Sequence, residues 1–228
     1  IIESPASIIK ELIENSMDAN SSAITVEIKD GGIQFIRVTD NGIGMSADDA
    51  KLALQRHATS KISSAKDLEL VSTLGFRGEA LASIAAVTQF EMFTRARDNI
   101  SGIHIINHGG EFIDIVETGC PEGTTIIVRN LFYNTPARLK FLKSTRAESA
   151  RISDIMGRLI IGNPNVSIKY INNGRIVYHS LGNGSLMSSI MAVYGSNMAE
   201  DLIEIDESNS DHNSDHNIDI RGFLGKPS

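Results

Sequence analysis

A stripe of polar side chains near the N-terminus is the first feature that could carry chemistry. Glu11, Asn15 and Asp18 are spaced by four and three residues, which places them on one face of a helix. In the hydrolysis of a nucleoside triphosphate, Glu11 could act as a base toward water and Asn15 could offer a neutral oxygen to Mg²⁺. Taken alone, such a pair is more commonly part of a solvated helix surface.

A glycine-containing turn follows the second expected strand. The residues Asp40-Asn41-Gly42-Ile43-Gly44 would let an aspartate point into a pocket while two glycines allow the backbone to approach a ligand closely. Asp40 could accept a hydrogen bond from the amino group of adenine. For this motif alone, a tight turn between a strand and a helix is the favoured alternative.

A second glycine-bracketed turn, Gly75-Phe76-Arg77-Gly78-Glu79-Ala80, precedes a short apolar helix. Free backbone N–H groups and the positive end of the helix dipole could hold phosphate at such a position. The sequence contains neither a P-loop nor a strand-linked Gly-x-Gly-x-x-Gly motif, which disfavours the two commonest nucleotide-binding folds. A nucleotide site here requires a different architecture.

Hydrophobic periodicity predicts the elements that would position these residues. Ser4 and Pro5 are typical of a helix start, and apolar residues then recur at helical spacing up to Ala19. Alternation predicts a hairpin of strands 24–29 and 33–39 across Asp30-Gly31-Gly32, ending at Asp40. Ser46 and Asp49 resemble a capping box for a helix through about Arg56, and residues 57–78 are expected to be mostly loop.

The remaining pattern predicts an α+β sandwich. A helix is expected at 79–86, and strands at 88–95, 102–106, 112–117 and 124–130 could form one antiparallel sheet. Helices are expected to start at Thr135-Pro136 and at Thr145 with Glu148, the latter ending at Gly162-Asn163-Pro164, and strands 166–171 and 175–179 should pair. A linker at 182–184 and a helix around 186–194 follow, and residues 202–205 are expected to open a second domain. Residues 207–217 are expected to be a disordered polar loop, although His212 and His216 could suggest a metal site.

Composition describes an ordinary globular chain with an acidic balance. The 228 residues include 41% hydrophobic residues, and the net charge is −7, which opposes non-specific attraction to nucleic acid. Any DNA contact must therefore use a local basic patch, for which the best candidate lies between Arg129 and Arg158, or these cations form a solvated helix face. The candidate cations are Arg138, Lys140, Lys143, Arg146, Arg151 and Arg158.

Two features of the sequence indicate the cellular compartment of the protein. The single cysteine, Cys120, cannot form an internal disulfide and has no His or Asp at catalytic or ligand spacing, so an unreactive buried or loop thiol is expected. No apolar stretch approaches the roughly 20 residues that a membrane span needs, and the first residues are too acidic for a signal peptide. We expect a cytoplasmic protein if the source is prokaryotic and a nuclear one if it is eukaryotic.

The order of these motifs is similar to that of the GHKL ATPase superfamily. More closely, the blocks ELIENSMDA, DNGIGM, RHATSKI, GFRGEALASI and GTTIIVRNLFYNTPARLKFL resemble the MutL family of DNA mismatch-repair proteins, over residues 5–145. The resemblance implies a Bergerat-type sandwich of helices on a mixed, mainly antiparallel sheet. It implies a GHKL ATPase domain at 1–184, a connecting helix at 185–200 and the start of a second domain at 201–228.

The resemblance also assigns roles to residues. It implies that Glu11 is the catalytic base, that Asn15 binds Mg²⁺, that Asp40 reads adenine and that Thr125 reaches back toward the adenine pocket. Asp18, Gly42 and Gly44 belong to the same implied ATP site. An implied ATP lid consists of Thr59, Ser60 and Lys61 with Gly75, Phe76, Arg77, Gly78, Glu79, Ala80 and Leu81.

At the level of function, the resemblance implies a slow Mg²⁺-dependent ATPase that acts as a nucleotide-switched clamp. Its implied partners are DNA, a MutS-type mismatch-recognition protein and a second copy or paralogue. The chain lacks the N-terminal arm of the family and most of the second domain, whose lysine contacts the γ-phosphate, so turnover is less firmly implied than binding. A type II topoisomerase or histidine kinase, and a non-catalytic ATP- or DNA-holding module, are the alternatives.

Overall fold

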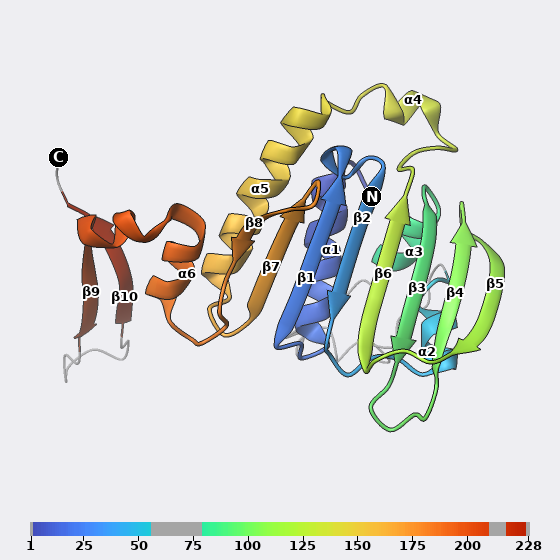
Figure 1. Cartoon of the computed structure of the whole chain (residues 1–228), viewed down its shortest axis with the longest axis horizontal. Helices are drawn as coiled ribbons and strands as arrows, with labels where there is room; N and C mark the ends of the chain where they lie inside the picture. Colours follow the sequence, from blue (N-terminus) through green and yellow to red (C-terminus); the bar gives the residue numbers. More distant parts are fainter. Residues whose placement is uncertain (1, 56–78, 210–217, 227–228) are drawn as a thin grey trace.

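The computed structural model describes residues 2–55, 79–209 and 218–226, which form an eight-stranded sheet with helices and a separate two-stranded hairpin (Figure 1). In chain order the elements are α1 (Pro5–Asp18), β1 (Ala23–Lys29), the 3-10 turn η1 (Asp30–Gly32), β2 (Phe35–Asp40), α2 (Ala47–Leu52), α3 (Ala80–Ala85), β3 (Gln89–Arg95), β4 (Gly102–His108), β5 (Glu111–Thr118), β6 (Gly123–Arg129), α4 (Pro136–Leu139), α5 (Thr145–Gly162), β7 (Ser167–Asn172), β8 (Arg175–His179), α6 (Leu186–Tyr194), η2 (Ser196–Asp201), β9 (Leu202–Asn209) and β10 (Ile218–Gly225). This confirms the α+β prediction.

The strand order of the large sheet is β5-β4-β3-β6-β2-β1-β7-β8. All neighbouring pairs are antiparallel except β1 and β7, which run parallel, so the sheet is mixed. In the registers of β2, Asp40 lies opposite Ile24 of β1 and opposite Thr124 of β6. The end of β2 and the start of β6 are therefore adjacent, although about eighty residues separate them in the sequence.

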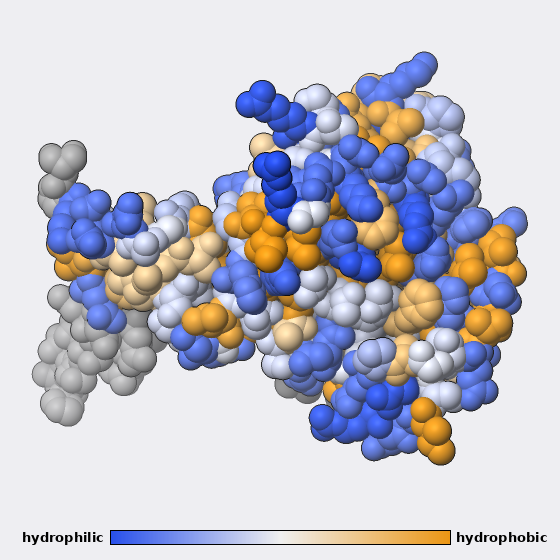
Figure 2. Space-filling model, viewed as in Figure 1, coloured by the Kyte–Doolittle hydropathy of each residue, from blue (hydrophilic) through white to orange (hydrophobic). Residues whose placement is uncertain are grey.

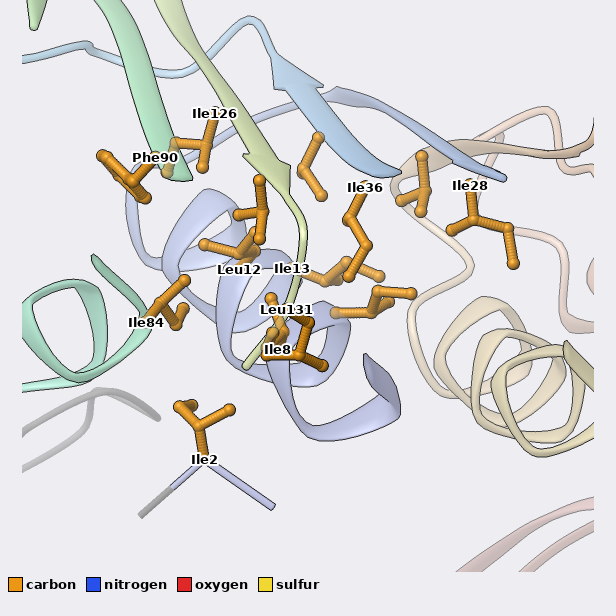
Figure 3. Packing of buried hydrophobic residues seen from close by; sticks show 14 of the residues in the cluster. Ile2, Ile8, Leu12, Ile13, Ile28, Ile36, Ile84, Phe90, Ile126 and Leu131 are labelled. Carbon is orange, nitrogen blue, oxygen red and sulfur yellow. The ribbon is translucent and has the colours of Figure 1, made fainter. Parts of the chain in front are cut away.

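The predicted first helix is confirmed. Ser4 caps α1 by accepting a hydrogen bond from the Ser7 backbone N–H, and the Ser7 side chain closes a capping box, with Pro5 in the first turn. The apolar residues that recur along α1 are buried against the sheet, where Leu12 and Ile13 lie among Ile36, Ile126 and Phe90 (Figure 3). The opposite stripe of α1 is left partly exposed.

The helices α1, α3 and α5 cover one face of the large sheet, behind it in Figure 1. Strands β1, β3 and β6 show the matching alternation, in which inward residues are buried and outward residues are at least partly exposed. Figure 2 shows the uncovered face, where hydrophilic residues surround separate hydrophobic ones. The sheet thus has one core face and one face toward solvent.

Two predicted helix boundaries are wrong. The helix that starts at Ser46 ends at Leu52 instead of near Arg56, because the backbone tightens to shorter-range turns that direct Leu54 into the core. The cap of α5 is Ser144, whose Oγ accepts from the Ala147 N–H, and not Thr145. The expected partner Glu148 instead accepts a hydrogen bond from the Lys143 backbone N–H.

Two strand predictions also need correction. Strand β2 begins at Phe35, two residues later than predicted, because residues 30–32 form a 3-10 turn in which both glycines have positive φ. Strand β9 extends through Asn209, so the first residues of the expected polar loop are paired with β10. The histidines of that loop lie outside the described residues. The domain boundaries near residues 184 and 200 stay predictions.

The turn after β2 has no room for a side chain at Gly44. Its φ of +64° is left-handed, and a Cβ atom built on it would lie 2.0 Å from the carbonyl oxygen of Arg95. The next residue, Met45, donates its backbone N–H to the buried Thr94 Oγ1 at 3.0 Å. The turn is therefore fixed against the end of β3.

We expect Ile36→Ala to lower the free energy of unfolding by about 2–5 kcal/mol, because the fully buried side chain would leave a cavity at the centre of the sheet. Urea denaturation monitored by circular dichroism measures this loss. The matched control is Ile113→Ala on the edge strand β5, where the side chain is 56% exposed and the expected change is within about 0.5 kcal/mol. Equal losses for the two variants would contradict the described core.

We expect Gly44→Ala to lower the melting temperature by at least about 2–4 °C, since the new methyl group must displace the Arg95 backbone and adopt a strained φ. Thermal denaturation measures the shift. Gly119→Ala is the control, because nothing lies within 4 Å of a Cβ atom there. A Gly44→Ala variant as stable as Gly119→Ala would show that the turn is not packed as described.

Candidate functional site

The carboxylate of Asp40 is the centre of a hydrogen-bond network at the end of β2. Its Oδ2 accepts from the Ser16 hydroxyl at 2.8 Å, and its Oδ1 accepts from the backbone N–H groups of Gly42 at 2.9 Å and Thr124 at 3.2 Å. Three donors from three different segments hold the carboxylate in one orientation. Asp40 is partly exposed, so the remaining acceptor positions can meet a ligand.

The Ser16 bond also brings the polar stripe of α1 to this turn. Ser16 is 3% exposed, Asn15 precedes it, and Glu11 lies one helical turn earlier. Glu11 and Asn15 are both partly exposed, and within the described ranges neither side chain forms a hydrogen bond or an ion pair. Asp18 continues the stripe toward the end of the helix. The helix that carries the predicted residues is therefore joined to the turn that begins at Asp40.

The turn itself is bound to the end of α1. Asn41 Oδ1 accepts from the backbone N–H groups of Ser22 and Ala23, and the Ile43 N–H bonds to the carbonyl oxygen of Ala19. A Cβ atom on the buried Gly42 would lie 2.7 Å from that same carbonyl. Gly42 is needed here because the backbone of the turn runs directly against α1.

Two threonines that the sequence pattern does not single out, Thr94 and Thr124, complete the floor of the site. Thr94 Oγ1, besides accepting from Met45, lies 3.0 Å from the Gly123 carbonyl oxygen and 3.0 Å from Thr124 Oγ1. Both threonines are buried on the helix-covered side of the sheet. They connect the glycine turn to the start of β6.

The structure does not bring the Thr125 side chain to Asp40. Successive residues of a strand point to opposite faces, and Thr125 Oγ1 donates to Thr39 Oγ1 at 3.1 Å, away from the buried face that carries Thr124. The residue of β6 beside the Asp40 carboxylate is thus Thr124. The sequence block Gly123-Thr124-Thr125 identified the segment but not the threonine that faces the site.

The predicted lid is only partly within the described residues. Thr59, Ser60, Lys61, Gly75, Phe76, Arg77 and Gly78 lie outside them. Glu79 is exposed at the entry to α3, and Ala80 and Leu81 form its first turn. Since α3 covers the same face of the sheet as α1, its first turn lies on the side where Asp40 is held (Figure 1).

A hydroxyl on an otherwise apolar helix face is the signal that could have identified Ser16. It follows Leu12 and Ile13 at helical spacing, so its side chain had to point toward the sheet. A buried hydroxyl needs a hydrogen-bond partner, and Asp40 provides a charged one. Thr94 and Thr124 carry no comparable signal, because threonine is common in strands.

A cavity of ≈ 620 Å³ borders this network at Met45 and Thr94. Its other lining residues belong to α2, the β3–β4 turn, β4 and β5, and none of them is a predicted site residue. Burial raises the pKa of the Cys120 thiol, and nearby Arg95 only partly opposes this shift. The raised pKa favours an unreactive thiol.

Across residues 2–55, 79–209 and 218–226, no group of three His, Cys, Asp or Glu could hold a metal, and no helix is suited to span a membrane.

The comparisons with known proteins agree with this geometry. Residues 2–112 match the family model described as histidine kinase-, DNA gyrase B- and HSP90-like ATPase. The DNA mismatch repair protein MutL of Symbiobacterium thermophilum is 47% identical over the whole chain, and that of Agathobacter rectalis is 45% identical. The chain spans about a third of these relatives, 35% and 34% of their lengths.

Solved structures show the same fold. The Aquifex aeolicus MutL ATPase domain complexed with ADP has a TM-score of 0.71 and 29% identity, covering 91% of this chain and 73% of that one. A second structure of the Aquifex aeolicus domain has a TM-score of 0.73 and 26% identity, covering 100% and 74%. The predicted family is therefore confirmed: the chain belongs to the MutL family of DNA mismatch-repair proteins and corresponds to its N-terminal GHKL-type ATPase domain.

Proposed function

We propose that this chain binds ATP with Mg²⁺ between α1, the turn after β2 and the start of α3, and hydrolyses it slowly. The observation that carries the proposal is the Ser16–Asp40 hydrogen bond. It joins α1, which carries the candidate base Glu11 and the candidate Mg²⁺ ligand Asn15, to the turn that begins at the candidate adenine-binding residue Asp40. The ADP complex of the related Aquifex aeolicus domain supports a nucleotide ligand.

The hydrogen bonds of Asp40 suit it to recognise adenine. A carboxylate only accepts hydrogen bonds, and its existing donors leave lone-pair positions on Oδ2 for an exocyclic amino group. The carbonyl oxygen at the same position of guanine would face another acceptor and be repelled. This difference favours ATP over GTP.

The stripe on α1 fits the water and metal chemistry of hydrolysis. Glu11 would orient and deprotonate the attacking water, and the amide oxygen of Asn15 would bind Mg²⁺, which keeps several waters and needs few protein ligands. When bound with the nucleotide, Mg²⁺ neutralises charge on the phosphates. The predicted lid residues 59–61 and 75–81 would close over the phosphates, with the first turn of α3 contributing backbone N–H groups.

We further propose that the domain contacts DNA through the basic segment after β6. Lys140, Lys143, Arg146 and Arg151 are exposed. Two of the predicted cations serve other contacts: Arg158 pairs with Asp154, and Arg138 bonds to the carbonyl oxygen of Ile2. ATP-dependent pairing with a second copy or paralogue, and contact with a MutS-type protein, belong to the same proposal, in the cytoplasm of a bacterial cell like those of its relatives.

We expect calorimetry to show Mg²⁺-dependent ATP binding to the wild-type chain and none to Asp40→Asn at concentrations that saturate the wild type. The asparagine would present an N–H group where the adenine amino group needs an acceptor. The matched control is Asp48→Asn on α2, where a 98% exposed carboxylate is changed to an amide and binding should be unaffected.

Glu11→Ala separates turnover from binding. Its ATP affinity should stay close to that of the wild type, while phosphate release should fall by about 10²- to 10⁴-fold because the base is lost. If the wild-type chain binds ATP but shows no turnover that depends on Glu11, a non-catalytic binding module is the better description. Failure of the wild type to bind ATP would contradict the proposed site.

A further inference from the structure

Two threonine hydroxyls lie beside the carboxylate of Asp40, on the helix-covered face of the sheet. Thr94 at the end of β3 and Thr124 at the start of β6 are directly opposite in the register of the two strands, and their Oγ1 atoms are 3.0 Å apart. Thr94 is fully buried, whereas Thr124 is 9% exposed, so Thr124 is the member of the pair that a ligand can reach. The Thr124 backbone N–H donates to Asp40 Oδ1, which fixes this strand residue beside the carboxylate.

The contacts of Thr94 exceed the single proton that its hydroxyl carries. Its Oγ1 accepts from the Met45 backbone N–H at 3.0 Å, and it lies 3.0 Å both from the Gly123 carbonyl oxygen and from Thr124 Oγ1. A carbonyl oxygen only accepts a hydrogen bond, whereas a hydroxyl both donates and accepts. The one Thr94 proton therefore goes either to Gly123 or to Thr124, and this choice decides what Thr124 offers to a ligand.

Two proton arrangements satisfy the pair, since at 3.0 Å one hydroxyl must donate to the other. In the first, Thr94 donates to the Gly123 carbonyl and accepts from Thr124, whose oxygen then presents only lone pairs to the site. In the second, Thr94 donates to Thr124, and the Thr124 proton is free to point into the site. Because Thr94 is fully buried, solvent does not compete for its hydroxyl. The pair can thus present either an acceptor or a donor beside Asp40.

We infer that Thr94 is a positioning residue for adenine, which acts by donating to Thr124 when the base is bound. The Thr124 hydroxyl then donates to the ring nitrogen that lies next to the amino group of the base. This inference deepens the proposed ATP site and rests on it. Adenine presents a donor, its amino group, beside an acceptor, its ring nitrogen. The Asp40 carboxylate suits the first, and a Thr124 proton that Thr94 directs suits the second.

The exchange between the two arrangements conserves the number of hydrogen bonds. Before binding, Thr94 donates to Gly123 and Thr124 donates to Thr94; afterwards, Thr94 donates to Thr124 and Thr124 donates to the base. Only the two hydroxyl protons rotate, and the bond from the Met45 N–H is kept in both arrangements. Guanine carries a hydrogen on the same ring nitrogen, so it would meet the Thr124 proton with a second donor. This conflict adds to the repulsion between its carbonyl oxygen and Asp40.

A purely structural role is the alternative for Thr94. The bond from the Met45 N–H by itself would hold the glycine turn against β3. Loss of that bond would lower the stability of the fold and weaken all nucleotides alike. A positioning role differs in one measurable property, because its effect on affinity depends on whether the base carries the ring nitrogen that accepts from Thr124.

The first test uses calorimetry to compare ATP with 1-deaza-ATP, in which a C–H group replaces that ring nitrogen. The wild type should bind ATP roughly 2- to 10-fold more tightly than 1-deaza-ATP, which corresponds to one neutral hydrogen bond. In Thr94→Val the ratio of the two affinities should fall close to unity, because the Thr124 hydroxyl loses the neighbour that orients it. Thr94→Ser keeps a hydroxyl at this position and should keep the ratio of the wild type.

Thr88→Val is the matched control for the loss of a buried hydroxyl. Thr88 is also fully buried, and its Oγ1 donates to a backbone carbonyl, that of Ile84, at 2.7 Å. This variant should lower the melting temperature as Thr94→Val does, and it should leave the ratio of the two affinities unchanged. Thermal denaturation establishes that each variant is folded at the temperature of the binding measurement.

The second test asks whether Thr94 acts through Thr124. Thr124→Val should by itself bring the ratio of the two affinities close to unity. Adding Thr94→Val to it should lower the ratio no further, because two residues that act as one unit have non-additive effects. Full retention of the wild-type ratio in Thr94→Val would overturn the positioning role, and so would a further fall in the double variant.

The outcomes also separate this inference from the proposed ATP site. If the wild type binds ATP and 1-deaza-ATP equally well, Thr124 directs no proton to the base, so the inference fails and the ATP site stands. If the wild type binds neither nucleotide, the ATP site fails and the inference fails with it. A ratio that is lost in Thr88→Val as well as in Thr94→Val would show a general disturbance of the fold and overturn the assignment to Thr94.

Discussion

The hydrogen bond between Ser16 and Asp40 is the contact on which the arrangement of the site depends. It joins a helix to the end of a strand across the layer boundary, and one partner is a charged group, which makes such a bond stronger than a neutral one. Because Ser16 is buried, water does not compete readily for its hydroxyl. The position of the predicted α1 residues relative to Asp40 follows from how α1 is placed against β2.

The free-energy cost of burying this polar network is offset because the surrounding core is apolar and continuous. Leu12 and Ile13 on α1 contact the same layer that holds Ile36 and Ile126, so the helix is fixed by packing before the hydroxyl is considered (Figure 3). The hydrogen bond then specifies rotation and register more than it supplies stability, since a single bond contributes about 1 kcal/mol net. Packing places the helix, and the polar contact orients it.

The sequence allowed the elements near the site to be predicted, because their signals are local. Ser4 and Pro5 mark the start of α1, alternation marks β1 and β2, and the glycines mark the turn. Contacts between distant segments were not predictable in this way. The face that Thr125 takes depends on the register of β6 against β2, and the resemblance to a family named the segment without fixing that register. Similarly, periodicity could not show that α2 stops at Leu52, because the backbone tightens where Leu54 meets the core.

The order of the strands has a consequence for the protein as it is synthesised. Strand β2 lies between β1, its neighbour in the chain, and β6, which is made more than eighty residues later, while β1 also waits for β7. The hairpin of β1 and β2 therefore leaves the ribosome with both outer edges unpaired, and such edges are prone to pair with other chains. The hydrogen-bond network of Asp40 is completed only when Thr124 has emerged, so a nascent chain shorter than this has the motif but not the network.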